Sequence, residues 1–393
     1  MQFEAKSANF LSLNALDYRL VRAIRITRNQ IPAKDLARPI LAEIEPYIPG
    51  KPISEVAREF GLTDVVKLAS NENPLGPSPK AVRAMQEAIH QVHLYPDGNA
   101  YYLRRRLAEY HNLPMESILP GNGSVEIIEI IAEAYLEPGR EAVTGPQAFF
   151  KYRIASQMMG VQPSMIPMPE FQYDIEAMIR ALTPRTKVVF IANPNNPTGW
   201  YLGCREVERL LGALPRGAIL VLDEAYFEYV QQPDYPDGLE YVKAGAPVIV
   251  LRSFSKVYGL AGVRCGYALT RPDIAADLQK VREVFNCNSL AQAAALASLD
   301  DSDYLKRSIE NNGKGLNDLA GGLKNLGLNV RPSVCNFVLV DFGRPIGPIF
   351  KEFLKRGVII RPMEPYDLPT CARISVGLPE QHQKLFSALR EIL

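Results

Sequence analysis

The sequence predicts an α/β fold in which a mainly parallel sheet is covered by helices on both sides. From about residue 60 onward, short apolar runs alternate with segments of helical periodicity over most of the chain. Runs of four or five consecutive apolar residues are typical of strands buried on both faces of a sheet. Ligands of such α/β sheets gather beyond the carboxyl ends of the strands, so the loops that follow the strands are expected to carry the function.

Three apolar runs in the middle of the chain are the clearest strand candidates. They comprise residues 188–192, 218–222 and 248–251, and the segment 204–213 between the first two has helical periodicity. Late in the chain, strand and helix candidates alternate again and predict a second, smaller α/β unit. These late elements are strands at 335–341, 358–360 and 373–376, and helices at about 346–356 and 379–392.

The composition is that of a globular protein with a small-molecule ligand. By length alone the 393 residues suggest roughly two or three structural units, and a net charge of +1 gives no attraction to nucleic acid or an anionic membrane. No uncharged apolar stretch reaches the roughly 20 residues of a membrane span. Five scattered cysteines and four histidines show no metal-ligand or disulfide spacing. We therefore expect a soluble, cytoplasmic protein without a bound metal.

The first 30 residues differ from the rest in being basic. Arginines recur with apolar residues between them, which a basic amphipathic presequence would show. The segment lacks the continuous apolar core of a secretory signal, and an ordinary N-terminal helix or tail is the favoured interpretation. The basic residues are Lys6, Arg19, Arg22, Arg25 and Arg28, against the acidic Glu4 and Asp17.

Lys256 follows the strand candidate at 248–251 and lies in a loop rich in hydroxyl groups. Ser253 and Ser255 precede it, and Arg264 follows eight residues later. A lysine that is desolvated or close to another cation loses its proton and can attack an aldehyde, while arginine can grip a phosphate with two hydrogen bonds. This combination suits pyridoxal 5'-phosphate (PLP). The alternative is an ordinary surface lysine in a serine-bearing loop.

The acid that follows the strand candidate at 218–222 has two serious interpretations. Asp223 would bind Mg²⁺ if this were the Walker B strand of a nucleotide hydrolase, but no G-x-x-x-x-G-K-[ST] phosphate loop exists in the chain. Alternatively, Asp223 would keep a pyridinium nitrogen protonated, so that the ring can accept electrons. Tyr226 would then donate to the phenolic oxygen of that ring.

Two further loops contain residues that suit a cofactor site. After the strand at 188–192, two prolines and a glycine fix a rigid turn that presents the amide of Asn196. In Pro120-Gly121-Asn122-Gly123-Ser124, the glycines permit close backbone approach, and we expect Ser124 to cap a helix over 125–135. A helix N-terminus favours an anion, so this loop is a candidate second half of a phosphate site.

Taken in order, these motifs resemble those of the fold-type I PLP-dependent aminotransferases, and within them most closely the histidinol-phosphate aminotransferases. The resemblance runs from about residue 36 to the C-terminus. It implies a large domain with a mainly parallel seven-stranded sheet between helices, and a smaller α/β domain at the C-terminus. The implied divisions are an extension at 1–35, a segment at 36–75 that joins the small domain, the large domain at 76–285 and the small domain at 286–393.

The resemblance also implies a role for each motif residue. Lys256 would form the internal aldimine with PLP and move a proton between substrate and cofactor, in two ping-pong half-reactions. Asp223 would pair with the pyridine nitrogen. The other implied contacts are Tyr226 and Asn196 to the phenolic oxygen, Ser253, Ser255, Arg264 and the backbone of Ser124, Val125 and Glu126 to the phosphate, Phe149 to the ring face, and Tyr95 to the phosphate of the partner subunit in a homodimer.

Substrate recognition is implied for residues near both ends of the chain. Arg361 and Arg373 would bind the acidic groups, because one site must accept both a dicarboxylate and a phosphorylated amino alcohol. Tyr47 and Asn196 would complete these contacts. The implied reaction is transamination of histidinol phosphate with glutamate and 2-oxoglutarate, in histidine biosynthesis.

Other functions stay open at this point. Aminotransferases for aromatic amino acids share these motifs, and a PLP lyase such as a threonine-phosphate decarboxylase would break a different bond at the same carbon. A catalytically silent regulatory domain is disfavoured because Lys256 is present.

Overall fold

The computed structural model describes residues 33–46 and 48–393 of the chain. Residues 33–46 belong to a unit separate from the rest, and they form helix α2 (Ala33–Leu36) and the 3₁₀ turn η1 (Pro39–Glu43). Tyr47 and the basic segment 1–30 lie outside the described residues. The fold and the site that follow belong to residues 48–393.

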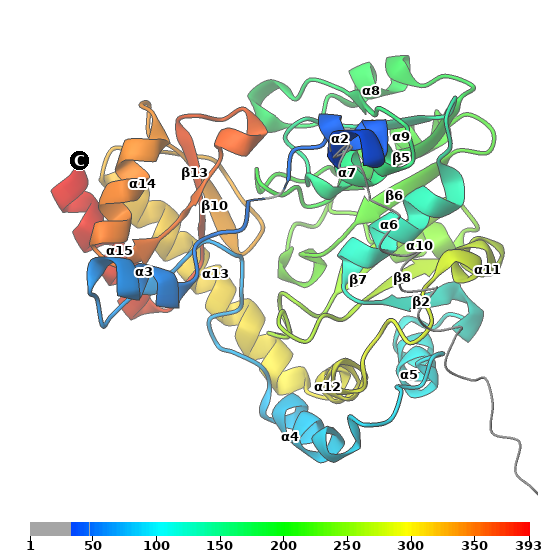
Figure 1. The fold of residues 1–393 in the computed structure, drawn as a ribbon, viewed down its shortest axis with the longest axis horizontal. Coiled ribbons are helices and arrows are strands. Elements are labelled where there is room, and N and C mark those ends of the chain that lie inside the picture. The colour runs from blue at the N-terminus through cyan, green and yellow to red at the C-terminus, as the bar shows by residue number, and fades with distance from the viewer. Residues whose placement is uncertain (1–32, 47) are drawn as a thin grey trace, which may run out of the picture. The chain divides into compact units, whose positions relative to one another are not determined.

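The predicted sheet has seven strands, in the order β2-β8-β7-β6-β5-β3-β4. Figure 1 labels the neighbouring strands β2, β8, β7, β6 and β5. Its strands run parallel to one another except β8, which is antiparallel to both of its neighbours, β2 and β7. The strand bounds are β2 (Ile118–Gly121), β3 (Glu141–Thr144), β4 (Ser164–Met165), β5 (Thr186–Ala192), β6 (Ile219–Asp223), β7 (Val248–Ser253) and β8 (Gly266–Thr270).

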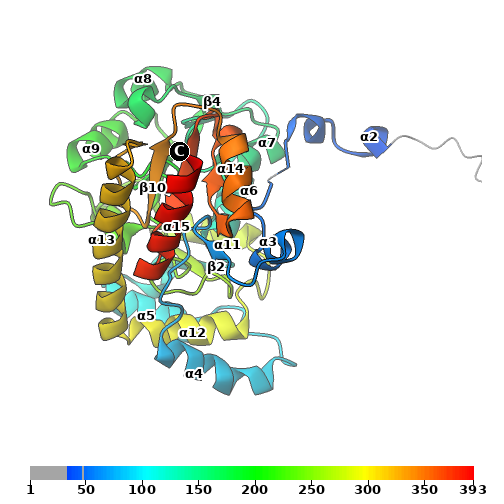
Figure 2. The same ribbon diagram turned by 90° about the vertical axis from the view of Figure 1, so that its left-hand side faces the viewer.

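Helices surround this sheet, and α4 packs against α12 next to it (Figure 2). Among the described residues, none of the helices has the length and apolarity to cross a membrane. The bounds of these helices are α4 (Pro79–Ala88), α5 (Tyr101–His111), α6 (Ser124–Tyr135), α7 (Lys151–Met158), α8 (Ile175–Ala181), α9 (Cys204–Gly212), α10 (Gly238–Lys243), α11 (Pro272–Val281) and α12 (Ser289–Leu299). Helix α3 (Ile53–Phe60) packs instead against the helix Ile346–Lys355.

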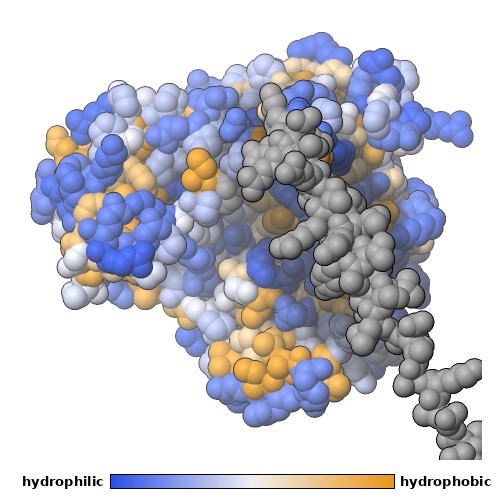
Figure 3. All heavy atoms as spheres, viewed as in Figure 1, coloured by the Kyte–Doolittle hydropathy of each residue, from blue (hydrophilic) through white to orange (hydrophobic). Residues whose placement is uncertain are grey.

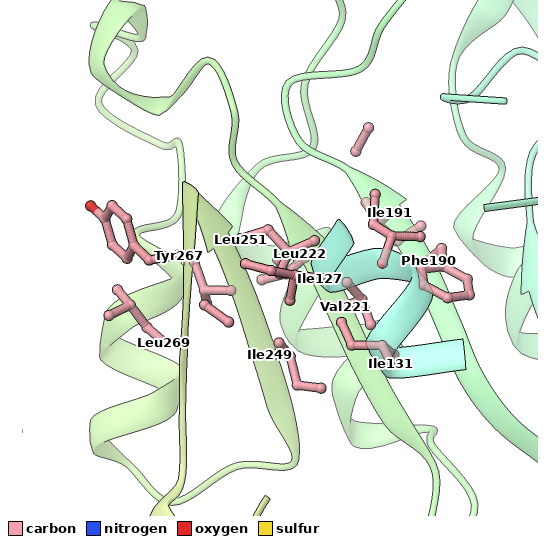
Figure 4. Packing of buried hydrophobic residues seen from close by; sticks show 14 of the residues in the cluster. Ile127, Ile131, Phe190, Ile191, Val221, Leu222, Ile249, Leu251, Tyr267 and Leu269 are labelled. Carbon is pink, nitrogen blue, oxygen red and sulfur yellow. The ribbon is translucent and has the colours of Figure 1, made fainter. Parts of the chain in front are cut away.

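The apolar runs in the sequence form strands because their side chains are buried in the hydrophobic core of the sheet. Ile127 and Ile131, one helical turn apart on α6, pack against side chains of β6 and β7 such as Leu222 and Ile249 (Figure 4). All four side chains are fully buried. The predicted strands at 188–192, 218–222 and 248–251 correspond to β5, β6 and β7, and burying a large aliphatic side chain of this kind contributes roughly 1.5–3 kcal/mol.

A second sheet has four antiparallel strands in the order β12-β13-β10-β9, with α13 and α15 beside it (Figure 2). The predicted strand at 358–360 is β11, and it pairs in parallel with β1 instead of joining this sheet. The domain boundaries stay a prediction. The remaining bounds are β1 (Val66–Lys67), β9 (Asn329–Val330), β10 (Phe337–Asp341), β11 (Val358–Ile359), β12 (Arg361–Pro362), β13 (Cys371–Ser375), α13 (Ser302–Asn325), α14 (Ile346–Lys355) and α15 (Pro379–Ile392).

The strand register brings the predicted functional loops to one edge of the seven-stranded sheet. Asp223 at the end of β6 is paired with Ala192 at the end of β5, and Ser253 at the end of β7 is paired with Gly266 of β8. Gly266 also pairs with Gly121 at the end of β2. The loops after β2, β5, β6 and β7 therefore start side by side.

Candidate active site

A cavity of about 230 Å³ lies at this edge of the sheet. Its walls come from the loops after β2, β5, β6 and β7 and from the segment before α7. The structure thus brings most of the predicted cofactor residues together. Those that line the cavity are Ser124, Val125, Phe149, Asn196, Asp223, Tyr226, Ser253, Ser255, Lys256 and Arg264.

A second cavity, of about 160 Å³, shares part of its wall with the first. Both cavities are lined by Lys256 and Tyr226, and the second also contains the two predicted substrate arginines, Arg361 and Arg373. Arg361 donates to the carbonyl of Ile48 at 2.8 Å. The lysine therefore lines both the first cavity and a second cavity that contains two guanidinium groups.

Three predicted residues are not placed in these cavities. Tyr95 is 82% exposed and stacks on Phe285, with ring centroids 4.7 Å apart. The Glu126 side chain accepts hydrogen bonds from the backbone N–H of Asn122 at 2.7 Å and from Asn286 at 2.6 Å, and does not line the cavity. Tyr47 lies outside the described residues.

One part of the first cavity is an anion cradle. Helix α6 begins there at Ser124, and its N-cap is Gly123, so the prediction that Ser124 is the cap was wrong by one residue. Gly123 has a φ of +81°, and a Cβ at this position would lie 2.5 Å from Nη2 of Arg264. Arg264 Nη1 lies 3.5 Å from Oγ of Ser255. A helix N-terminus, a guanidinium and serine hydroxyls are donors that suit a phosphate.

Lys256 lines both cavities, and the pKa of its amine is lowered there. Burial lowers the pKa of Lys256 to about 8, helped by the positive charges of Arg373 and Arg264 and opposed by Glu72 and Asp223. Its Nζ is 5.5 Å from the centroid of the Tyr226 ring. A lysine in this state is a nucleophile and a base near neutral pH.

Asp223 lies buried at the end of β6 and lines the first cavity. Burial raises its pKa to about 6, while hydrogen bonds from the Tyr152 hydroxyl at 2.8 Å and the Ala225 N–H at 3.2 Å oppose the rise. The sequence motifs alone do not identify Tyr152 as a site residue. The signal available was its position three residues after Phe149, in the same aromatic motif.

The side chains of Tyr226 and Asn196 are held by residues from distant parts of the chain. The Tyr226 hydroxyl accepts a hydrogen bond from Nδ2 of Asn71 at 2.9 Å. Oδ1 of Asn196 accepts one from Arg373 at 2.5 Å, and Arg373 also donates to the carbonyl of Ala69 at 2.8 Å. Arg373, a predicted substrate residue, is therefore hydrogen-bonded to Asn196, a predicted cofactor residue.

The fold and this site define the class of protein as an α/β transferase of fold type I, as predicted. The chain matches the model of the family "Aminotransferase class I and II" over residues 63–389, and it belongs to this family.

Among curated proteins and solved structures, the chain is similar to histidinol-phosphate aminotransferases. It is 46% identical to that of Moorella thermoacetica, over 91% of this chain and 92% of the relative. It is also 46% identical to histidinol-phosphate aminotransferase 2 of Pseudomonas aeruginosa, over 91% of this chain and 98% of the relative. The crystal structure of the Sinorhizobium meliloti histidinol-phosphate aminotransferase in complex with PLP superposes with a TM-score of 0.82 at 28% identity, covering 91% of this chain and 97% of that one.

Proposed function

We propose that this chain transfers an amino group between histidinol phosphate and 2-oxoglutarate, with PLP as the cofactor, in histidine biosynthesis. The observation that carries the proposal is the pair of arginines, Arg361 and Arg373, in a cavity that also contains Lys256. The names of the similar proteins, at 46% identity over nine-tenths of the chain, support the same substrate.

The residues present fit PLP by the chemistry of their side chains. The anion cradle of Arg264, Ser255 and the α6 N-terminus suits the phosphate, and a Cβ on Gly123 would intrude on it. Asp223 suits the protonated pyridine nitrogen, and Phe149 lines the same cavity as an aromatic that can cover the ring face. When bound, PLP carries the amino group and accepts electrons from the substrate α-carbon.

Lys256 performs the proton transfers in this proposal. Because burial and the nearby arginines lower its pKa to about 8, part of the amine is unprotonated at neutral pH. Nζ of Lys256 would hold the cofactor and would remove the proton from the substrate α-carbon. The residue lines both cavities, so it reaches cofactor and substrate from one position.

Arg361 and Arg373 bind the anionic groups of the two substrates. Glutamate carries two carboxylates, whereas histidinol phosphate carries a phosphate ester on the carbon that corresponds to the α-carboxyl group of an amino acid. A planar guanidinium pairs with either group through two parallel hydrogen bonds, which explains how one site accepts both molecules. Arg373 is fixed by Asn196 and by the carbonyl of Ala69, so its direction is set before substrate binds.

The protein acts as a homodimer in this proposal, with Tyr95 contributed to the partner's phosphate site. Exposed apolar side chains recur in the segments 89–102 and 284–285, which meet where Tyr95 stacks on Phe285. Figure 3 shows apolar surface at the bottom of the view, where α4 lies in Figure 1. Exposed apolar patches of this kind mark protein interfaces. The exposed residues concerned are Ile89, Val92, Leu94, Tyr95, Tyr101, Tyr102, Val284 and Phe285.

We also propose a cytoplasmic location, which the composition supports. The five cysteines are scattered along the chain and are free thiols in the structure. Thiols persist in a reducing compartment.

The test is a set of single half-reactions with the PLP-loaded protein. Histidinol phosphate, phenylalanine, tyrosine and threonine phosphate are mixed separately with the enzyme, and the visible absorbance of the bound cofactor is followed. We expect histidinol phosphate to bleach the band fastest. If phenylalanine or tyrosine bleaches it and histidinol phosphate does not, the chain is an aromatic aminotransferase. Release of carbon dioxide from threonine phosphate would instead support a lyase.

A further inference from the structure

Asn71 is a buried residue with an unusual backbone conformation at the wall of the second cavity. It is 1% exposed and has a φ of +55°. Asparagine adopts this left-handed conformation more readily than most residues other than glycine. Its carbonyl accepts a hydrogen bond from Nδ2 of Asn336 at 2.9 Å, so the backbone is held in place. In this conformation the side-chain amide of Asn71 reaches Tyr226.

Contacts with Ser375 decide which end of this amide faces Tyr226. The backbone N–H of Asn71 donates to Oγ of Ser375 at 2.8 Å, and the same hydroxyl donates to Oδ1 of Asn71 at 2.9 Å. Because Oδ1 is engaged by Ser375, Nδ2 is the atom that faces Tyr226 and donates to its hydroxyl at 2.9 Å. An amide nitrogen cannot accept a hydrogen bond, so the Tyr226 proton points elsewhere.

The direction of that proton matters because Tyr226 lines both cavities. Among residues 33–46 and 48–393, none accepts a hydrogen bond from the Tyr226 hydroxyl. We propose that Asn71 is a positioning residue that turns the hydroxyl proton of Tyr226 into the active-site cavity, where it is donated to the phenolic oxygen of the cofactor. This inference rests on the proposed function, which assigns that contact to Tyr226.

Ser375 connects the hydrogen bond between Asn71 and Tyr226 to Arg373, the proposed substrate-binding arginine. It lies two residues after Arg373 on β13, and its backbone N–H donates to the carbonyl of Leu68 at 2.9 Å. Arg373 itself donates to the carbonyl of Ala69. The segment 68–71 is therefore joined to β13 at successive points, and the same strand orients the substrate arginine and the Tyr226 proton.

Replacing Asn71 with aspartate tests the direction of the hydrogen bond with almost no change of shape. In Asn71→Asp, one carboxylate oxygen still accepts from Ser375, while the other accepts the proton of Tyr226 and withdraws it from the cavity. When the phenolic oxygen of the cofactor loses the hydrogen bond from Tyr226, its negative charge is less stabilised. The cofactor proton that titrates beside this oxygen is therefore released at a higher pH. We expect the pH midpoint of the visible absorbance of the PLP-loaded protein to rise by about one unit.

Two other variants accompany this titration. Tyr226→Phe removes the donor altogether and is expected to raise the midpoint by a similar amount. Asn112→Asp is the matched control, since Asn112 also has a left-handed backbone, with a φ of +51°, but is exposed at the end of α5 and lines neither cavity. We expect its midpoint to equal that of the wild type.

The outcomes separate the inference from the proposed function. A shift in Tyr226→Phe with a wild-type midpoint in Asn71→Asp would overturn the role of Asn71 and leave Tyr226 as a cofactor ligand. No shift in Tyr226→Phe would remove the proposed contact of Tyr226, and the inference with it. If Asn71→Asp does not fold, Asn71→Gly tolerates the left-handed backbone and removes the amide, and the midpoint must still rise, by a smaller amount, for the inference to hold.

Discussion

The hydroxyl of Tyr152 donates a 2.8 Å hydrogen bond to Oδ2 of Asp223, and both side chains are buried. Tyr152 is fixed in turn by stacking on Phe190, with ring centroids 5.1 Å apart. Burial raises the pKa of Asp223 to about 6, and the hydrogen bonds from Tyr152 and from the Ala225 N–H act against this rise. The tyrosine therefore helps to keep Asp223 ionised near neutral pH, which is the form that pairs with a pyridinium nitrogen.

Removing that hydroxyl in Tyr152→Phe is expected to weaken PLP binding about tenfold, because a hydrogen bond to a buried carboxylate is lost. The pKa of Asp223 rises in the variant, so binding falls off at a higher pH than in the wild type as the solution is acidified. Equilibrium dialysis against PLP between pH 5 and 8 measures both effects, with the pH range set by the pKa of about 6. Tyr201→Phe, which removes a more exposed hydrogen bond to Asp234, is the control. Identical binding curves for Tyr152→Phe and the wild type would refute this role.

The lowered pKa of Lys256 predicts how fast the cofactor-free protein takes up PLP. Only the unprotonated amine attacks an aldehyde, so the rate should rise with pH and level off above about pH 8. In Arg373→Gln the levelling should occur at higher pH, because a positive charge that lowers the pKa has been removed. Stopped-flow absorbance across this pH range measures the rate. A rate that still climbs at about pH 10 would indicate an ordinary, solvated lysine.

A side chain added at Gly123 is predicted to disturb the anion cradle specifically. In Gly123→Ala the new Cβ meets Arg264 at 2.5 Å, and we expect PLP affinity to fall at least about tenfold. Gly61→Ala is the matched control, because its φ of +66° imposes similar backbone strain with no atom within 4 Å of the new Cβ. Both variants should lose about 1 kcal/mol of unfolding free energy in urea, and only the first should release PLP. Equal PLP affinity in the two variants would contradict the cradle.

A mixing experiment tests whether Tyr95 serves the partner's site. Lys256→Ala and Tyr95→Ala are each expected to be impaired, but a hybrid dimer contains one site with both native side chains. Random reassembly makes about half of the dimers hybrids, so about a quarter of wild-type activity should return. The activity of the mixture after mild denaturation and refolding measures this. Recovery no greater than the sum of the two variants would place Tyr95 in its own subunit's site or outside any site.

The sequence predicts the parts of this fold that local patterns determine. The strands β5, β6 and β7 were predicted because each is a run of apolar residues that the sheet buries. The loops after them were expected to carry function because parallel strands end at one edge, and the register of Asp223 beside Ala192 agrees. The family, the fold class and the cofactor class followed from the order of the motifs, and the comparisons confirm them.

Other features depend on contacts between distant residues, which no local pattern reports. Tyr152 meets Asp223 across 71 residues, and Asn71 meets Tyr226 across 155. The pairing of β11 with β1 is equally remote in sequence, and each strand is only two residues long. The cap of α6 was misplaced for a local reason, since Gly123 adopts a positive φ that places Ser124 inside the helix. Contacts between distant residues, such as Tyr152 with Asp223, are visible only in the folded structure.

The most direct measurement compares histidinol phosphate with histidinol, which lacks the phosphate, as donors in the first half-reaction. If Arg361 and Arg373 bind the phosphate, the wild type should use histidinol phosphate at least about 100-fold more efficiently, and Arg361→Gln should lose most of that preference by slowing only the phosphorylated donor. The rate of bleaching of the bound cofactor, divided by donor concentration, gives each value. Equal efficiency with the two donors in the wild type, or an unchanged preference in Arg361→Gln, would contradict the proposed recognition of histidinol phosphate.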